Sequence, residues 1–338
     1  MRVKREREVR QTRGGLIRRI ALAGALIAAL TGGLASCGGS SATSELHIAM
    51  VLGLDTNSSY QSAFCGAKAA AKKAGNVDVT FNGVATSDAS AEVPLLDSAL
   101  ALKPNGMIVV PSEPAGMQGA LQSVVNQGVK LITVDIQPSK PIGLTFIGPN
   151  GFTGGALAAQ FLATKMNHKG LVFIDSYLPG ASPEDRVVGF ENYMKANDPA
   201  IQELPVQFSN AEPTLAAQQT AAALAANPNI TGLFGQNEET AIGMATAVRE
   251  AGLQGKIPFV AYDADVNEVA LLKNGTFDAL VSQGFYYEGY TGVQILTKVL
   301  RGEESASHVA SSTGTQLKVL TPANVGDASS KAFIYTGC

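Results

Sequence analysis

Four polar side chains directly follow apolar runs of the kind that form strands, and their types suit the recognition of hydroxyl groups. Carboxylates accept hydrogen bonds from two hydroxyls, and side-chain amides both accept and donate. Taken singly, an Asp at a strand end is usually a helix cap or a turn former, and an Asn or Gln there is usually solvated. Their recurrence favours a site for a sugar or polyol. The four are Asp135 after Leu131–Val134, Asn237 after Gly232–Gln236, Asp263 after Phe259–Tyr262, and Gln283 after Leu280–Ser282.

Aromatic residues are available to pack against the apolar C–H face of a sugar ring. Tyr60 is the first candidate for this stacking contact. Further aromatic side chains come just after the strand that ends at Gln283, namely Phe285, Tyr286, Tyr287 and Tyr290.

A regular alternation of strands and helices must position these residues. Several of the expected strands are continuous apolar runs, as in parallel sheets that are covered on both faces. The alternation predicts a doubly wound α/β architecture, in which ligands bind at the carboxyl ends of strands. We expect strands at 46–52, 77–82, 106–110, 130–135, 171–175, 230–234, 257–262 and 279–283, and helices at 63–74, 93–102, 117–126, 154–166, 214–226, 240–251 and 289–300.

The sequence also contains a coarse duplication. Residues 107–113 and 233–239 each pass from a strand through polar residues into a helix. Two copies of one strand-end arrangement are what two similar lobes would supply, so we look for binding groups at these ends.

Charge and length limit the class of protein. The chain has 25 basic and 28 acidic residues, of which 8 basic and 2 acidic precede Cys37, so the 302 residues after position 36 carry a net charge of −9. They include no Trp and no basic stripe, which excludes nucleic acid as a partner. A chain of this length suits two lobes rather than one core.

The N-terminus reads as an export leader. Eight basic residues before position 20 are followed by the apolar run Ile20–Leu30 and then by Leu34-Ala35-Ser36-Cys37. A charged region, a short apolar region and a small-residue cleavage site make a signal peptide, here residues 1–36, and the run is too short for a permanent membrane span. Residues 37–45 are small and polar and are expected to form a tether. The Arg18-Arg19 pair permits twin-arginine export, but its flanks favour the general secretory route.

The sequence around Cys37 resembles the lipobox of bacterial lipoproteins. The resemblance implies cleavage before Cys37 and a diacylglycerol on its sulfur, with the protein held outside the cytoplasm on a bacterial cell membrane, at its periplasmic face or outer surface. The alternative is a plain secretory signal with an accidental cysteine. In either case Cys65 and Cys338 lie in an oxidising compartment. We predict that they form a disulfide; a buried free Cys65 and a frayed Cys338 are the alternative.

From about Leu46 to Gly302 the chain resembles the ribose-binding-protein-like branch of type I periplasmic binding proteins, the substrate-binding components of sugar ABC transporters. The motifs occur in the family's order: the first strand and loop through Asn57 and Tyr60, Val134-Asp135, Arg186-Val187-Val188-Gly189-Phe190, Gln236-Asn237-Glu238, Tyr262-Asp263 and Ser282-Gln283. The resemblance implies ligand contacts from Asn57, Tyr60, Asp135, Arg186, Asn237, Asp263 and Gln283.

Two positions depart from the family pattern. The family often has a second aromatic residue before the Tyr60 position, where this chain has Ser59. The ribose binders have Arg directly after the first Asp, where this chain has Ile136. Both departures point away from ribose itself and leave a differently sized sugar, a polyol or another small polar metabolite open.

The resemblance further implies two Rossmann-like doubly wound lobes joined by a three-strand hinge. The expected N-terminal lobe is 46–147 with 285–313, and the expected C-terminal lobe is 148–284 with 314–338. The crossings are expected near 147–150, 283–285 and 311–316. A monomer would close on its ligand by a hinge motion and present it to ABC permease subunits.

An enzyme is the principal competing class. The paired Asp135 and Asp263 resemble a glycosidase acid and base, but an open polar cleft with Arg beside them is expected to keep both ionised. The chain has three histidines, no Gly-x-Ser-x-Gly elbow and no His-Glu-x-x-His helix. We therefore expect no catalysis, no metal and no cofactor. A sensory lipoprotein of the same fold, acting with a receptor instead of a permease, is the other alternative.

Overall fold

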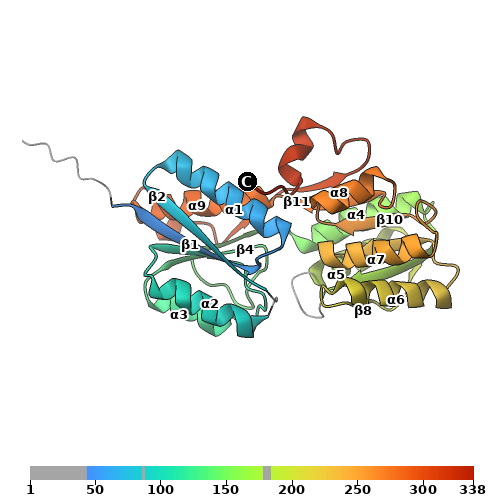
Figure 1. The fold of residues 1–338 in the computed structure, drawn as a ribbon, viewed down its shortest axis with the longest axis horizontal. Helices are drawn as coiled ribbons and strands as arrows, with labels where there is room; N and C mark the ends of the chain where they lie inside the picture. The colour runs from blue at the N-terminus through green and yellow to red at the C-terminus, as the bar shows by residue number, and fades with distance from the viewer. Residues whose placement is uncertain (1–43, 86–87, 178–183) are drawn as a thin grey trace, which may run out of the picture. The chain divides into compact units, whose positions relative to one another are not determined.

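The structure is a computed structural model that describes residues 44–85, 88–177 and 184–338 (Figure 1). The predicted signal peptide, Cys37 and the tether up to residue 43 lie outside the described residues. Within the described ranges, no helix combines the length and the apolar character needed to cross a membrane.

The first sheet has six strands in the order β12-β5-β4-β3-β1-β2, and all of its strand pairs are parallel. We call this sheet and the helices that cover it lobe 1. Its strands are β1 (Leu46–Leu54), β2 (Val77–Val84), β3 (Gly106–Val109), β4 (Lys130–Val134), β5 (Thr145–Gly148) and β12 (Ser312–Gly314).

The second sheet has seven strands in the order β13-β11-β10-β9-β6-β7, with β8 also paired to β6. We call it and its helices lobe 2. Only the β11–β13 pair is antiparallel in the part of this sheet that is described. The strands are β6 (Gly170–Ser176), β7 (Ile201–Glu203), β8 (Gln207–Phe208), β9 (Gly232–Gly235), β10 (Phe259–Tyr262), β11 (Ala279–Gln283) and β13 (Leu317–Leu320).

Helices cover both faces of each sheet. Figure 1 shows α1 and α9 on one side of the first sheet and α2 and α3 on the other. In lobe 2, α4 and α5 pack on one face and α6, α7 and α8 on the other. The bounds are α1 (Ser58–Ala74), α2 (Ala89–Ala101), α3 (Gln118–Asn126), α4 (Gly151–Lys165), α5 (Glu184–Asn197), α6 (Pro213–Ala226), α7 (Glu238–Glu250), α8 (Val266–Lys273) and α9 (Phe285–Leu300), with 3₁₀ turns η1 (Ala306–His308) and η2 (Ala328–Phe333).

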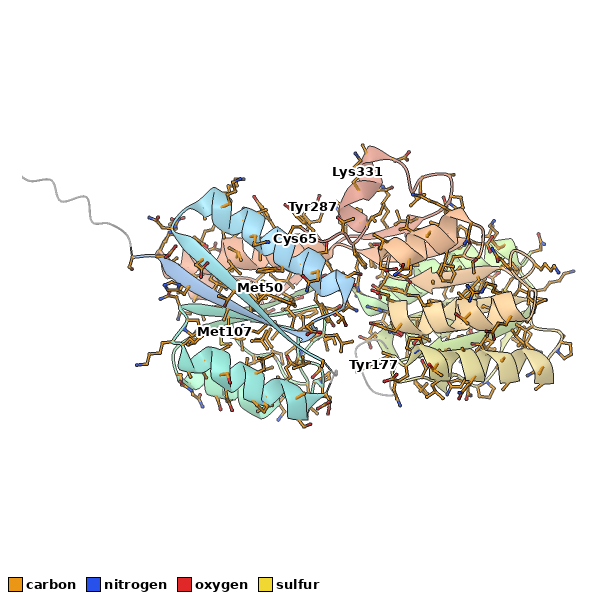
Figure 2. All side chains as sticks on the ribbon, in the orientation of Figure 1. Met50, Cys65, Met107, Tyr177, Tyr287 and Lys331 are labelled. Carbon is orange, nitrogen blue, oxygen red and sulfur yellow. A yellow bond between two sulfur atoms is a disulfide. The ribbon has the colours of Figure 1, made fainter. Side chains whose placement is uncertain are left out.

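The strands are apolar on both faces because each face has its own core. In β1, Ile48, Met50 and Leu52 belong to the core under α1 and α9, while Ala49 and Val51 belong to the core under α2 and α3. The buried methionines Met50 and Met107 mark these two cores (Figure 2). This alternation is the two-residue period of a strand buried on both sides, which agrees with the predicted doubly wound fold.

Several elements were absent from the sequence-based expectation. Helices α5 and α8 and the strands β5, β7, β8, β12 and β13 were not predicted. The missed strands have two to four residues, which is too few for a clear alternation pattern. Helix α9 begins at Phe285 instead of 289, because its aromatic first turn packs into the core of lobe 1.

The chain passes between the two sheets three times, from β5 to α4, from β11 to α9 and from β12 to β13. These passages fall within the three predicted crossing regions. The last residues of the sequence differ from the predicted assignment to the second lobe, because they contact both lobes. Tyr335 packs in the core of lobe 1, although β13 and η2 lie beside the second sheet.

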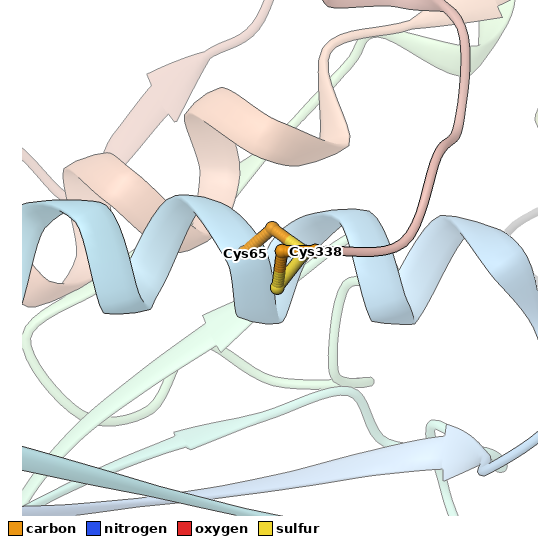
Figure 3. Close-up of a disulfide and its surroundings, with 2 residues drawn as sticks. All are labelled: Cys65 and Cys338. Carbon is orange, nitrogen blue, oxygen red and sulfur yellow. A yellow bond between two sulfur atoms is a disulfide. The ribbon is translucent and has the colours of Figure 1, made fainter.

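A disulfide joins Cys65 in the middle of α1 to Cys338, with their Cα atoms 5.5 Å apart (Figure 3). The two cysteines are 273 residues apart in the sequence. The bond therefore ties the last described residue to the first helix of lobe 1.

Glycines allow two helix pairs to approach closely. A Cβ at Gly155 of α4 would come closer than 3.0 Å to the backbone oxygen of Arg186, and one at Gly189 of α5 would meet the backbone of Phe152 equally closely. Gly66 of α1 and Gly289 of α9 play the same part in lobe 1. The Gly of the Arg-x-x-Gly-Phe motif is thus a packing residue that seats α5 against α4.

We predict that Gly155→Ala lowers the free energy of unfolding by about 1–3 kcal/mol, because the added methyl group overpacks a backbone contact that has no room to adjust. Urea denaturation measures this loss. The matched control is Gly119→Ala in α3, where an added Cβ would have nothing within 4 Å. Equal stability of the two variants would contradict the proposed close packing.

Candidate functional site

The seven predicted binding residues line one cavity of about 70 Å³. At roughly 10–15 Å³ per water, this is room for about five to seven waters. Asn57, Tyr60 and Asp135 come from lobe 1, whereas Arg186, Asn237, Asp263 and Gln283 come from lobe 2. Of the further aromatic candidates, Phe285 also lines the cavity, whereas Tyr286, Tyr287 and Tyr290 are not among the lining residues. The other lining residues were not selected from the sequence as binding residues: Leu54, Ser59, Ile136, Tyr177, Ala211 and Glu239.

The two aspartates occupy equivalent places in the two lobes. Asp135 follows β4 with φ 60°, and Asp263 follows β10 with φ 85°. In each case the Asp N–H donates to the next strand, from Asp135 to the Ile147 oxygen and from Asp263 to the Val281 oxygen, both at 3.0 Å. Asp tolerates positive φ better than most residues. The duplicated strand end therefore supplies one carboxylate from each lobe.

Arg186 is the central cation of the site and is 7 % exposed. Its Nη1 donates to the Gln236 backbone oxygen at 3.0 Å and lies 3.9 Å from Asp263 Oδ2. The guanidinium carbon lies 3.8 Å from the centre of the Tyr262 ring. Burial alone would lower the pKa of Arg186, whereas Tyr262 and the two aspartates together raise it. The guanidinium thus lies over the Tyr262 ring and beside the Asp263 carboxylate, an arrangement suited to hydrogen-bond donation toward a ligand.

Burial also changes the aspartates. It raises the pKa of Asp135 to about 6, although Arg186 opposes the shift and Asp263 adds to it. The pKa of Asp263 is raised by burial too, against the effects of Arg186 and of Gln283 Nε2, which donates to Asp263 Oδ1 at 3.1 Å. Desolvation in the cavity thus works against the ionised form of both aspartates, which Arg186 supports, so the expectation that both stay ionised considered only the effect of Arg186.

On the lobe 1 side, one polar residue both caps a helix and lines the cavity. Asn57 caps α1, since its side-chain oxygen accepts from Ser59 N at 2.9 Å. The Tyr60 hydroxyl donates to Asp135 Oδ2 at 3.2 Å and so orients this carboxylate. The capping role that a lone Asn usually has is thus present, together with a place in the cavity wall.

Two carboxylates missed by sequence reasoning join the lobes. Asn57 Nδ2 donates to Glu239 Oε1 at 3.0 Å, and the Ser58 hydroxyl donates to Glu238 Oε2 at 3.1 Å. Asn237 Nδ2 also donates to Glu239, at 2.6 Å. Burial, with Glu239 next in effect, raises the pKa of Glu238 to about 9, and burial raises that of Glu239. Their position directly after Asn237 was the one available signal.

The aromatic surface of the cavity comes from three elements. Tyr60 and Phe285 are arranged edge to face with ring centres 6.0 Å apart. Tyr177, which follows β6, lines the cavity from lobe 2 (Figure 2). Ser59 and Ile136, the two departures from the family pattern, also line it. The cavity therefore has aromatic lining residues at positions other than 59.

The raised carboxyl pKa values predict that the ligand-free protein melts at a higher temperature at pH 5 than at pH 8. The folded-state pKa is about 6 for Asp135 and about 7 for Glu92, Asp175 and Glu203, against ordinary values of 3.8 for Asp and 4.5 for Glu. Between these limits the folded chain holds more protons than the unfolded chain, so stability falls as the pH rises through this window.

Calorimetric melting across this pH range tests the direction of the effect. Asp135→Asn removes one of the titrating groups. It should reduce the change in melting temperature below about pH 6, since the folded-state pKa of Asp135 is about 6. A melting temperature that is higher at pH 8 than at pH 5 would contradict the analysis.

Comparisons with known proteins agree with the fold. The periplasmic binding protein domain family matches residues 48–304. The D-ribose/D-allose-binding protein of Pseudomonas aeruginosa is 24% identical over 266 residues, which cover 76% of this chain and 83% of that protein. The xylitol-binding protein of Mycolicibacterium smegmatis is 26% identical over 234 residues, 69% of this chain and 66% of that protein.

Solved structures extend the similarity. An ABC transporter solute-binding protein from Agrobacterium vitis with bound α-D-tagatopyranose has a TM-score of 0.81 and 31% identity, covering 86% of this chain and 99% of its own. A second solute-binding protein from that organism, with bound D-fucose, has a TM-score of 0.80 and 30% identity. The match covers 86% of this chain and 100% of that chain. With its two doubly wound lobes, its shared strand-end cavity and a family match across most of its length, the chain belongs to the periplasmic binding protein family, in its ribose-binding-protein-like branch.

Proposed function

We propose that this protein is the extracytoplasmic substrate-binding component of an ABC importer, which takes a small sugar or polyol between its lobes and presents it to the permease. The observation that carries the proposal is the convergence of Asn57, Tyr60, Asp135, Arg186, Asn237, Asp263 and Gln283 on one cavity. The sugar-binding relatives and solved structures support the same substrate class.

The unused hydrogen-bonding groups of the cavity favour a neutral ligand rich in hydroxyls. Asn237 Oδ1 and Gln283 Oε1 are buried acceptors without a hydrogen-bond partner among the described residues. Asp135, Asp263 and Glu239 supply further acceptors against one cation, Arg186. Hydroxyl donors satisfy such acceptors, whereas an anionic ligand would face an excess of carboxylates. The apolar Ile136 beside Asp135 favours a sugar or polyol other than ribose.

Ligand binding is proposed to select the closed form by a hinge motion. The contacts Asn57–Glu239 and Ser58–Glu238 join lobe 1 to lobe 2 and can form only when the lobes meet. A ligand that touches Asp135 on one lobe and Arg186 on the other adds to these contacts and shifts the population toward closure. The hinge itself is braced where Thr315 donates to Glu288 of α9 at 3.2 Å, between two of the crossings.

Anchoring is proposed to depend on Cys37. Its sulfur would carry the lipid, and the residues up to 45 would span the distance from the membrane to the fold. The protein would act as a monomer, since each chain contains a complete cavity built from its own two lobes.

We predict that Arg186→Ala and Asp263→Asn each weaken sugar binding by tens- to hundreds-fold, equivalent to about 2–4 kcal/mol, because each leaves a buried charge without its partner. Isothermal titration against D-ribose, D-allose, D-tagatose, D-fucose, D-arabinose and xylitol provides the measurement, followed by a wider panel of polyols. A product assay on the same mixtures tests for turnover, which is not expected.

The control for Asp263→Asn is Asp97→Asn on the exposed side of α2, which should bind as wild type does. If both site variants remain folded and bind the selected sugar as tightly as wild type, the cavity described above is not the binding site.

We predict that Cys37→Ala releases the protein from the membrane or leaves it unprocessed, because no helix within the described ranges can span a bilayer. Detergent-phase partitioning and the mass of the mature protein measure this, with Cys338→Ser as the control that retains the lipid. Partitioning of Cys37→Ala that is identical to wild type would rule out lipidation at this residue.

A further inference from the structure

Residues 334–338, which we call the tail, contact the strand end that carries Asp263. Tyr335 is 1 % exposed, and its N–H donates to the Ala264 oxygen at 2.9 Å, directly after Asp263. A parallel β-bridge pairs it with Asp265. Tyr335 therefore extends the strand-end region that carries one of the two cavity aspartates.

The Tyr335 hydroxyl has a defined set of partners. The Gln283 backbone N–H donates to it at 3.1 Å, and the Ser282 hydroxyl lies 3.3 Å away. Asp263 Oδ1 lies 3.3 Å from the same hydroxyl and, as a carboxylate oxygen, accepts its proton. Since a hydroxyl has one proton to give, Tyr335 directs it at Asp263 Oδ1, the oxygen that also accepts from Gln283 Nε2.

The Tyr335 ring connects this arrangement to lobe 1. It packs edge to face against Phe285, with ring centres 5.2 Å apart, and Phe285 packs in the same way against Tyr60. Phe285 and Tyr60 both line the cavity. An aromatic row of Tyr335, Phe285 and Tyr60 thus runs from the C-terminal residues to the cavity wall.

The disulfide holds the tail in this place. Cys338, three residues after Tyr335, is bonded to Cys65 of α1, the helix that is capped by Asn57 and carries Tyr60. The tail leaves η2 beside the second sheet and is fastened covalently to lobe 1. It forms a fourth link between the lobes, in addition to the three passages of the chain.

We propose that Tyr335 is a positioning residue for Asp263, and that the Cys65–Cys338 disulfide keeps it in position, so that the affinity of the cavity depends on a bond remote from the ligand. The inference rests on the proposed function, because it assigns Asp263 to ligand binding. Nothing in the family resemblance required a tail that reaches this carboxylate.

The test uses the full-length protein in detergent, with the variants Tyr335→Phe and the double variant Cys65→Ser/Cys338→Ser. Tyr335→Phe keeps the ring and loses the hydroxyl. The probe is whichever of D-ribose, D-allose, D-tagatose, D-fucose, D-arabinose and xylitol binds wild type most tightly. Both variants should bind it about tenfold more weakly, the effect of one lost hydrogen bond to a charged group. The control Tyr193→Phe, on α5 outside the cavity lining, should match wild type.

A pH profile separates positioning from a general loss of structure. The Tyr335 hydroxyl lowers the pKa of Asp263, so its removal should move the acid loss of affinity to higher pH in Tyr335→Phe and leave the profile of Tyr193→Phe unchanged. Wild-type affinity and an unshifted profile in Tyr335→Phe would overturn the role of Tyr335. Wild-type affinity in the double serine variant would overturn the role of the disulfide.

A ligand-free measurement distinguishes this failure from a failure of the proposed function. Hydrogen exchange at the Gln283 amide, which donates to Tyr335, should be faster in both variants than in wild type. If none of the six sugars binds wild type, the proposed substrate class fails. In that case, exchange at the Gln283 backbone amide that is as slow in both variants as in wild type would still overturn the positioning role of Tyr335 and the disulfide. Folded wild-type protein, reduced with dithiothreitol and alkylated, replaces the double variant should the latter fail to fold.

Discussion

The buried guanidinium of Arg186 is the constraint on which the cavity depends. Moving a charge from water into the protein interior costs free energy of desolvation, and this cost is offset only when the charge is paired and hydrogen-bonded. Asp263, the Gln236 oxygen and the Tyr262 ring provide these partners, and Asp135 faces the group from the other lobe. The close contact of α4 with α5 positions Arg186, because Gly155 packs against the Arg186 backbone. The electrostatics of the site therefore depend on this helix packing.

The duplicated architecture explains why two lobes make one site. In each sheet one parallel strand, β4 or β10, is followed by an aspartate with positive φ, and the N–H of each aspartate donates to the adjacent strand. A single lobe therefore offers only half of the polar groups a small polyol needs. Two such halves together form one cavity, although neither lobe supplies the full set of polar groups.

The sequence was a good guide to strand ends and a poor guide to contacts between distant segments. Apolar runs followed by Asp135, Asn237 or Asp263 are local patterns, so both the fold class and these residues could be predicted. Glu239 meets Asn57 across 182 residues, a pairing that no periodicity reveals. The burial that raises the pKa of Asp135 also depends on residues from both lobes and not on any one segment. Short strands such as β5 and β12 escape prediction because pairing, not composition, makes them strands.

The separation of Cys65 from Cys338 has a consequence for biogenesis. A chain that leaves the cytoplasm N-terminus first exposes Cys65 to the oxidising side long before its partner, 273 residues later, arrives. The covalent ring can close only after residue 338 has been translocated. A truncated export product would have its first helix and most of both sheets, yet it would retain an unpaired thiol on α1. That thiol would mark it as incomplete to the thiol-exchange machinery of the compartment in which it folds.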